Sequence, residues 1–287
     1  MSASGVSGEQ PGCDPTQFVR KVHFSFGFFD ATMPAGVAKH VQATRDANPD
    51  FEVTVWGPDQ ALQLMETHFP ALVPTYRAMP YAIQRSDMSR YAILWVHGGM
   101  YADLDYQFTK PLAQVLCAVY GSGTINAFVN ETPNASKLRR RASNSLMGSR
   151  APGHPFWAAV LRAVTRGWGL SRRQIVLSSA GPQAVDRALT AWRRSHGGSL
   201  GDVALLPKRQ FNPCSVCNRH SLNVAAQPHV LAYHTNGGSW HSADTAITNT
   251  LYCDWPWAVV TGILLVLTIT FLVLWVLGRK KGSRVVH

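Results

Sequence analysis

The chain has 287 residues, of which 46% are hydrophobic and 15% charged, and its formal net charge is +11. This apolar fraction excludes wholesale disorder, and the length suffices for one large domain with a real core. The sequence carries no recognisable nucleic-acid-binding module beside its basic residues, so we do not expect a polynucleotide partner.

Strand and helix signals alternate along the chain. In chain order we expect a strand at 22–26, a helix at 34–47, a strand at 51–56, helices at 58–68 and 84–96, a strand at 100–105, helices at 155–167 and 182–194, and strands at 203–206 and 230–233. Prolines in the first turns and the Asn48-Pro49 pair mark helix boundaries. Strands interleaved with helices predict an α/β fold with a largely parallel sheet.

The segment from Ala258 to Leu277 has 20 residues without a charge, about the length that a helix needs to cross a bilayer. It is apolar on all sides, which favours a single-pass transmembrane helix over a buried core helix. The tail after it carries Arg279, Lys280, Lys281 and Arg284. The positive-inside rule would place this tail in the cytosol, whereas insertion as a tail anchor would place it in the lumen, so the sidedness stays open.

These features divide the chain into five parts. We expect a disordered lead at 1–17, one globular domain at 18–245, a linker at 246–257, the transmembrane helix at 258–277 and a basic tail at 278–287.

The five cysteines form a sparse set. Cys214-Ser-Val-Cys217 with His220 supplies only half of a structural zinc site, so a local disulfide or two ordinary thiols is favoured over zinc. Asn130 and Asn134 begin sequons for N-glycosylation, which matter only if this part of the chain is lumenal.

The richest chemistry lies between Ser86 and Asp105. Asp103 and Asp105 are two residues apart on the predicted strand, so their side chains leave the same face, about 6.6 Å apart at the backbone. Two such carboxylates repel each other unless a hard divalent cation such as Mn²⁺ or Mg²⁺ lies between them. Asp87 and Arg90 share one helix face. One alternative is that these are surface aspartates without a function, and another is an aspartyl phosphatase. The phosphatase motif requires Thr or Val two residues after the second aspartate, where this chain has Gln107.

The block S-D-x-x-R-Y-x-x-L-x-x-x-G-G-x-Y-x-D-x-D at 86–105 resembles the DXD-containing glycosyltransferases of family 32. That family includes Och1-like α-mannosyltransferases and the fungal inositol-phosphoceramide mannosyltransferases. The resemblance extends from about Lys21 to Asp244, and its matching segments are 22–26, 48–52, 144–149, 153–156, 180–182 and 233–241.

The resemblance implies a GT-A fold, a Rossmann-like nucleotide-sugar-binding α/β domain. It implies a metal-dependent, retaining transfer of a hexose, favoured as mannose, from GDP-mannose or a UDP-hexose. The favoured acceptor is a membrane sphingolipid such as inositol phosphoceramide, and the expected setting is the Golgi or another endomembrane. A glycan-directed transferase and a catalytically silent sugar- or lipid-binding module of the same fold are the alternatives.

The resemblance also implies roles for single residues. Asp103 would contact the donor and help to hold the metal, Asp105 would bind the metal directly, and Asp87 and Arg90 would orient the donor sugar and its diphosphate. The remaining expected site residues are His234 as a third metal ligand, Ser239 and Trp240 closing over the diphosphate, and Asn144 hydrogen-bonding near the reacting centre. His234 could instead be a core histidine, Trp240 could only pack, and Asp87 could be a helix N-cap.

Overall fold

The structure is a computed structural model, and it describes residues 13–28, 32–133, 141–215, 217, 227–235, 243–253 and 255–282. The chain divides into two compact units, Met1–Trp240 and His241–His287. We call the first the catalytic unit, after the transferase activity that the family resemblance implies, and describe each unit by itself.

The catalytic unit contains a six-stranded sheet with the order β2-β1-β3-β6-β5-β7. Its strands are β1 (Lys21–Ser25), β2 (Glu52–Trp56), β3 (Gly99–Ala102), β5 (Ala127–Glu131), β6 (Ala142–Ser149) and β7 (Val203–Leu206). The α/β class is confirmed, but the sheet is more mixed than expected. β6 runs antiparallel to both β3 and β5. Only ten residues separate β5 from β6, fewer than the dozen or so that a parallel crossover needs.

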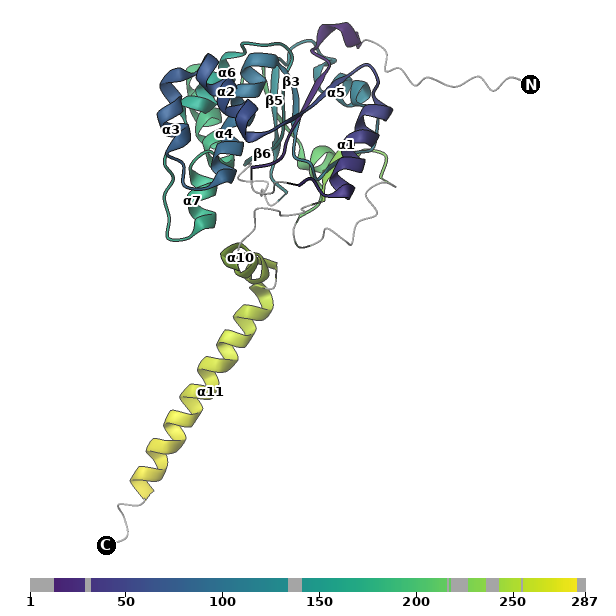
Figure 1. The fold of residues 1–287 in the computed structure, drawn as a ribbon. Coiled ribbons are helices and arrows are strands. Elements are labelled where there is room, and N and C mark those ends of the chain that lie inside the picture. Colours follow the sequence, from purple (N-terminus) through teal and green to yellow (C-terminus); the bar gives the residue numbers. More distant parts are fainter. Residues whose placement is uncertain are drawn as a thin grey trace, which may run out of the picture. The chain divides into compact units, whose positions relative to one another are not determined.

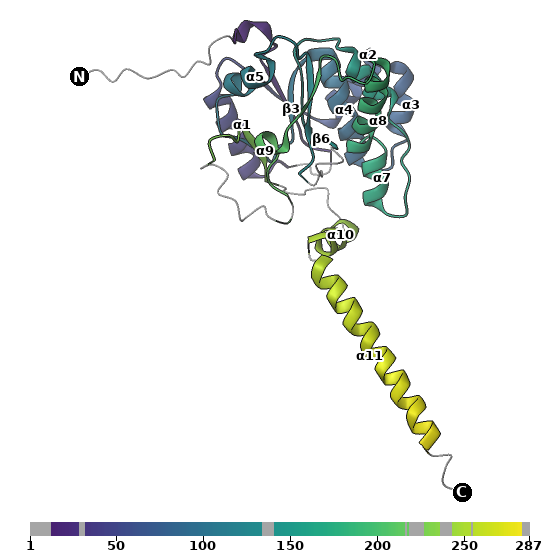
Figure 2. The same ribbon diagram turned by 180° about the vertical axis from the view of Figure 1, so that it is seen from behind.

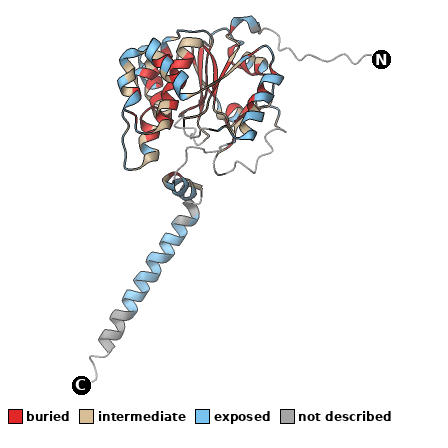
Figure 3. Cartoon of the chain, viewed as in Figure 1, coloured by how far each residue is buried: buried red, intermediate tan, exposed pale blue. Residues whose placement is uncertain are grey.

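Helices cover both faces of this sheet (Figures 1 and 2). One layer contains α2 (Pro58–His68), α3 (Val73–Arg77), α4 (Ala82–His97), α6 (Pro155–Arg162), α7 (Arg172–Ser178) and α8 (Pro182–Ser195). The other contains α1 (Ala35–Ala47), α5 (Leu112–Tyr120) and α9 (Lys208–Phe211), and the short 3-10 helices are η1 (Pro15–Gln17) and η2 (Pro70–Leu72). Each layer packs its apolar face on the sheet, which produces two hydrophobic cores (Figure 3).

The helix α4 is buried along most of its length and leads directly into the central strand β3. Two glycines make this reversal possible, since Gly98 and Gly99 have φ angles of 64° and 79°. A Cβ at Gly99 would lie 2.6 Å from the Lys21 carbonyl oxygen, so only glycine fits against β1 there. The reversal fixes where β3 begins and therefore where the acidic pair after it lies.

The predicted strand at 100–105 is too long. β3 ends at Ala102, and Asp103 and Asp105 lie in the turn before β4 (Tyr106–Phe108). The amide of Asp103 still donates to the Ser145 carbonyl on β6, at 2.8 Å, and the amide of Tyr106 donates to the Asp103 carbonyl at 3.0 Å. That second bond closes a tight turn, so the two carboxylates are presented by a turn and not by one strand face.

A second, two-stranded sheet completes the unit. β4 pairs antiparallel with β8 (Ala232–His234), and Tyr106 is the register partner of His234. This pairing carries a residue more than a hundred positions later in the sequence to the acidic turn.

The cysteines differ from the expectation. Cys13 and Cys117 form a disulfide across 104 residues, tying the segment before β1 to α5. Cys214 is buried and forms no disulfide, whereas Cys217 is disulfide-bonded, so the expected Cys214–Cys217 bridge and the pair of ordinary thiols are both wrong. His220 and Asn134 lie outside the described residues. Asn130 is fully buried in β5, which leaves no space for a glycan in the folded chain.

The second unit contains α10 (Ala243–Cys253) and α11 (Trp255–Gly282). Most of the segment expected as a linker, 246–257, is therefore helical. α11 confirms a helix over the apolar segment 258–277, but the membrane span itself is not confirmed. Searched over the described residues, the structure contains no helix that is both long enough and apolar enough to cross a bilayer.

Candidate metal and donor site

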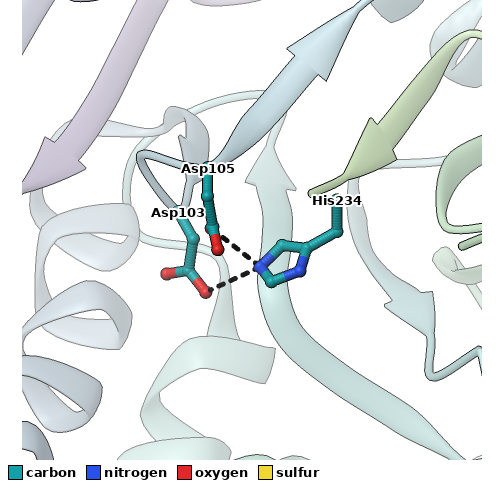
Figure 4. A group of neighbouring side chains, drawn as sticks. All are labelled: Asp103, Asp105 and His234. Atoms are coloured by element: carbon teal, nitrogen blue, oxygen red, sulfur yellow. Dashed lines mark ion pairs between the residues drawn. The ribbon is translucent and has the colours of Figure 1, made fainter. Parts of the chain in front are cut away.

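Three side chains from two segments converge beside the end of β3 (Figure 4). Asp103 and Asp105 come from the β3–β4 turn, and His234 comes from the end of β8. The His234 Nε2 atom lies 2.8 Å from Asp105 Oδ1 and 3.8 Å from Asp103 Oδ2. The structure therefore brings together the three residues that the sequence predicts as metal ligands.

The geometry of this group fits a divalent cation. One potential ligand atom from each residue lies within 4.8 Å of the others. Neighbouring ligands of an octahedral ion at a bond length of about 2.1 Å are about 3 Å apart. The 2.8 Å distance matches this spacing, and the 3.8 Å distance is somewhat longer. Carboxylate oxygens and one imidazole suit Mn²⁺, and carboxylates also suit Mg²⁺. The side chains are 17–28% exposed, so part of the coordination shell faces solvent and could take substrate oxygens.

Burial lowers the pKa of His234, but hydrogen bonds and charges from Asp103 and Asp105 outweigh this effect and raise the pKa to about 10. In the metal-free chain the imidazole therefore carries a proton at neutral pH and offsets the two carboxylates. A cation at this position takes over that role and displaces the proton.

Arg90 is in direct contact with the cluster of Asp103, Asp105 and His234, which we call the metal group. Its Nη1 atom is 3.0 Å from Asp103 Oδ1, and its Nη2 atom is 2.9 Å from Asp87 Oδ1. Burial would lower the pKa of Arg90, but the neighbouring Asp103 carboxylate raises it, and the guanidinium remains charged. Its carbon also lies 4.7 Å from the centre of the Tyr101 ring, a cation–π contact. Arg90 thus fixes the position of the Asp103 carboxylate beside the end of β3.

Asp87 and Asn144 complete this buried layer. Asn144 Nδ2 donates to Asp87 Oδ1 at 2.9 Å, and its carbonyl accepts from Arg90 Nη1 at 2.6 Å. Burial raises the pKa of Asp87 to about 6, against the opposing charge of Arg90. Asp87 is not a helix N-cap, because α4 begins at Ala82 and Tyr81 holds the cap position.

The sequence assigns direct donor contacts to Asp87 and Arg90, and a place near the reacting centre to Asn144. All three are less than 10% exposed. Both terminal nitrogens of Arg90, Asp87 Oδ1 and Asn144 Nδ2 are engaged within this layer or with Asp103, whereas the buried Arg90 Nε has no hydrogen-bond partner among the described residues. Their geometry favours positioning of Asp103 over contact with a ligand. Ser239 and Trp240 lie outside the described residues.

Two tyrosines that the sequence did not single out support the metal group. The Tyr101 hydroxyl donates to Asp103 Oδ1 at 3.1 Å. The Tyr106 ring packs edge-on against the His234 imidazole at 5.0 Å, and its hydroxyl accepts from Asn130 Nδ2 at 2.8 Å. Both tyrosines are buried. Tyr101 lies two residues before Asp103, and this spacing was the one hint that it faces the same region, whereas no such spacing pointed to Tyr106.

Comparison with known proteins places this geometry in context. Residues 34–121 match the family described as "Glycosyltransferase sugar-binding region containing DXD motif". A mannosyl phosphorylinositol ceramide synthase of Saccharomyces cerevisiae is 26% identical over 253 residues, covering 86% of this chain and 60% of the relative. Inositol phosphoceramide mannosyltransferase 3 of Schizosaccharomyces pombe is 27% identical over 224 residues, covering 75% and 54%. The chain thus spans little more than half the length of these relatives.

Among solved structures, the ligand-free glycosyltransferase domain of the YGT toxin is similar to this chain with a TM-score of 0.45 and 8% sequence identity. The match covers 66% of this chain and 80% of that domain.

Proposed function

We propose that this chain, whose residues 34–121 match the DXD-containing glycosyltransferase family, has a GT-A-like fold and transfers a hexose from a nucleotide sugar with the help of a divalent cation held by Asp103, Asp105 and His234. The favoured sugar is mannose, from GDP-mannose, with a UDP-hexose as the alternative donor. The convergence of two carboxylates and an imidazole at the end of β3 is the observation that carries this proposal.

Charge explains why the reaction needs such a group. Cleaving the bond between the sugar and the phosphate leaves new negative charge on the departing nucleoside diphosphate, and a divalent cation would stabilise that charge. Asp103 and Asp105 supply the anionic ligands, and Arg90 keeps Asp103 in place. Because these side chains are positioned before substrate arrives, the chain does not have to reorganise them during the reaction.

We propose retention of configuration, with attack from the side that the diphosphate leaves. A covalent sugar–enzyme intermediate requires a carboxylate free to attack the sugar carbon. The nearby carboxylates are engaged: Asp87 bonds Arg90 and Asn144, Asp103 bonds Arg90, and Asp105 bonds His234. This supports a mechanism in which the acceptor oxygen attacks directly and the leaving phosphate accepts its proton.

A membrane lipid is the favoured acceptor, specifically a sphingolipid such as inositol phosphoceramide. The names of the two fungal relatives support this choice. The Cys13–Cys117 disulfide supports an oxidising setting for the catalytic unit, since such bonds persist in lumenal compartments, and the Golgi lumen would satisfy this condition.

The test is a donor and acceptor screen with the purified full chain. We expect nucleoside diphosphate release from GDP-mannose only with Mn²⁺ or Mg²⁺, faster with inositol phosphoceramide than with a mannan oligosaccharide. Faster transfer to the oligosaccharide would overturn the lipid acceptor and leave the transferase activity standing. A chain that binds donor but neither transfers nor hydrolyses the sugar would be a silent binding module, against our proposal.

A further inference from the structure

Two large apolar side chains project from the loop between α6 and α7. Trp168 is 64% exposed and Leu170 is fully exposed. In the described part of the catalytic unit they are the only large apolar side chains that are mostly open to solvent. Exposed apolar side chains that lie close together mark interaction sites more often than single ones do, and only one residue separates these two.

Hydrogen bonds to α7 hold the loop backbone in place, so the exposure of the two side chains is a fixed property of the fold. The amide of Trp168 donates to Ser178 Oγ at 2.8 Å, and the amide of Leu170 donates to Gln174 Oε1 at 2.8 Å. Gly169 between them has a φ of 131°, a conformation that side-chain-bearing residues rarely adopt. Both apolar side chains are therefore directed outward by a backbone fixed to α7.

The surroundings of the loop are basic. Arg162 and Arg166 are exposed, and Arg172 and Arg173 are partly exposed. The sequence has no aspartate or glutamate from Thr132 to Val185, so no acidic neighbour along the chain offsets these charges. A tryptophan and a leucine beside arginines suit the surface of a lipid bilayer, which has an apolar interior and can carry anionic headgroups.

The loop lies at the same end of the unit as the metal group. The Arg172 guanidinium carbon is 5.2 Å from the centre of the Tyr81 ring, and Tyr81 is the N-cap of α4, the helix that carries Asp87 and Arg90. Figures 1 and 2 show the segment between α6 and α7 running down the outer edge of the helix layer to α7. A surface that binds the loop would therefore lie at the end of the unit where α4 begins.

We propose that the α6–α7 loop, residues 163–171, docks the catalytic unit on an anionic lipid bilayer. Trp168 and Leu170 enter the headgroup boundary, and Arg162 and Arg166 contact the anionic headgroups. This surface needs no donor or metal, so it stands or fails separately from the transferase activity.

The environment of Trp168 tests the docking directly. We compare the full chain with its Trp168→Phe variant in vesicles of phosphatidylcholine whose acyl chains carry bromine, with and without phosphatidylserine. The difference between the two emission spectra belongs to Trp168. We expect bromine to quench most of this difference signal when phosphatidylserine is present, and little of it in vesicles of phosphatidylcholine alone. Binding through another part of the chain does not imitate this result.

Charge variants provide the matched control. Arg162→Gln with Arg166→Gln should weaken docking about fivefold per arginine, measured as the quenching of the Trp168 signal. Arg193→Gln with Arg194→Gln, exposed at the far end of α8, removes the same charge and should leave the quenching unchanged. Equal quenching in neutral vesicles, no quenching at all, or a Trp168 emission that is already blue-shifted without vesicles would overturn the proposal. The last result would mean that protein covers the loop.

Discussion

The Nη1 atom of Arg90 lies 3.0 Å from Asp103 Oδ1, so a buried guanidinium on α4 fixes one carboxylate of the metal group on the β3–β4 turn. The same guanidinium pairs with Asp87 one helical turn earlier. The buried Asp87 carboxylate and the partly exposed Asp103 carboxylate therefore share one buried cation, and removing that cation takes an ion-pair partner from each.

Arg90→Ala should lower the free energy of unfolding by about 3–5 kcal/mol, because it leaves the buried Asp87 carboxylate uncompensated. Arg90→Lys should restore part of this stability but not the activity, since an ammonium cannot hold Asp103 and Asp87 in one planar fork. Urea denaturation and steady-state kinetics measure the two effects. Arg77→Lys is the control, because its pair with Glu66 is exposed and contributes about 1 kcal/mol or less. Full activity in Arg90→Lys would argue against the positioning role.

The chain should lose stability in mild acid through His23. Its Nε2 donates to the Gly98 carbonyl at 3.0 Å and its Nδ1 accepts from Trp56 Nε1 at 3.3 Å, so the folded state holds a neutral imidazole. Burial lowers the pKa of His23 to about 4. The unfolded chain takes up the proton near pH 6.5, so stability is complete above that pH and falls toward pH 4, by about 3 kcal/mol.

His23→Gln should be less stable than the wild type at pH 7 but should lose much of this acid dependence. Denaturation at several pH values gives the comparison. An unchanged slope between pH 6.5 and 4 in the variant would mean that other groups cause the acid sensitivity.

Removing the disulfide should destabilise the catalytic unit without changing its chemistry. Cys13 and Cys117 are separated by 104 residues, and closing so long a loop restricts the unfolded chain strongly. The double variant Cys13→Ser, Cys117→Ser should lose about 2–5 kcal/mol of unfolding free energy. Mn²⁺ affinity, measured well below the melting temperature, should stay the same, since neither cysteine touches the metal group. A loss of Mn²⁺ affinity in the folded variant would contradict that separation.

Mn²⁺ binding should strengthen as the pH rises. Because Asp103 and Asp105 hold the pKa of His234 near 10, a cation must displace a proton from the imidazole at neutral pH. The affinity should therefore rise up to about tenfold per pH unit between pH 6 and 9. Calorimetry in two buffers of different ionisation enthalpy detects the released proton, and His234→Ala should release none. Equal proton release from both proteins would assign the proton to another group.

The sequence predicted the α/β class and the boundaries of α4 to within two residues, and the family resemblance named the three residues Asp103, Asp105 and His234 that the structure brings together. These succeeded because helix periodicity is local and because the residues recur in a recognisable block. Their role as metal ligands stays a prediction. Tertiary pairing decided the rest. β6 has few β-branched residues and gave no strand signal, yet it pairs on both sides within the sheet. The burial of Arg90 and the Cys13–Cys117 bond depend on contacts between distant segments, which spacing along the chain does not reveal.

Mn²⁺ titration of the full chain, followed by the electron paramagnetic resonance signal of the free ion, tests the metal group most directly. One ion should bind per chain, with affinity reduced about 100-fold or more in Asp105→Ala and His234→Ala, and binding should tighten when a nucleoside diphosphate is added. The exposed Asp50→Ala variant controls for a general loss of charge. Wild-type affinity in Asp105→Ala, with the nucleotide still tightening the binding, would show that the cation lies elsewhere and would contradict the account.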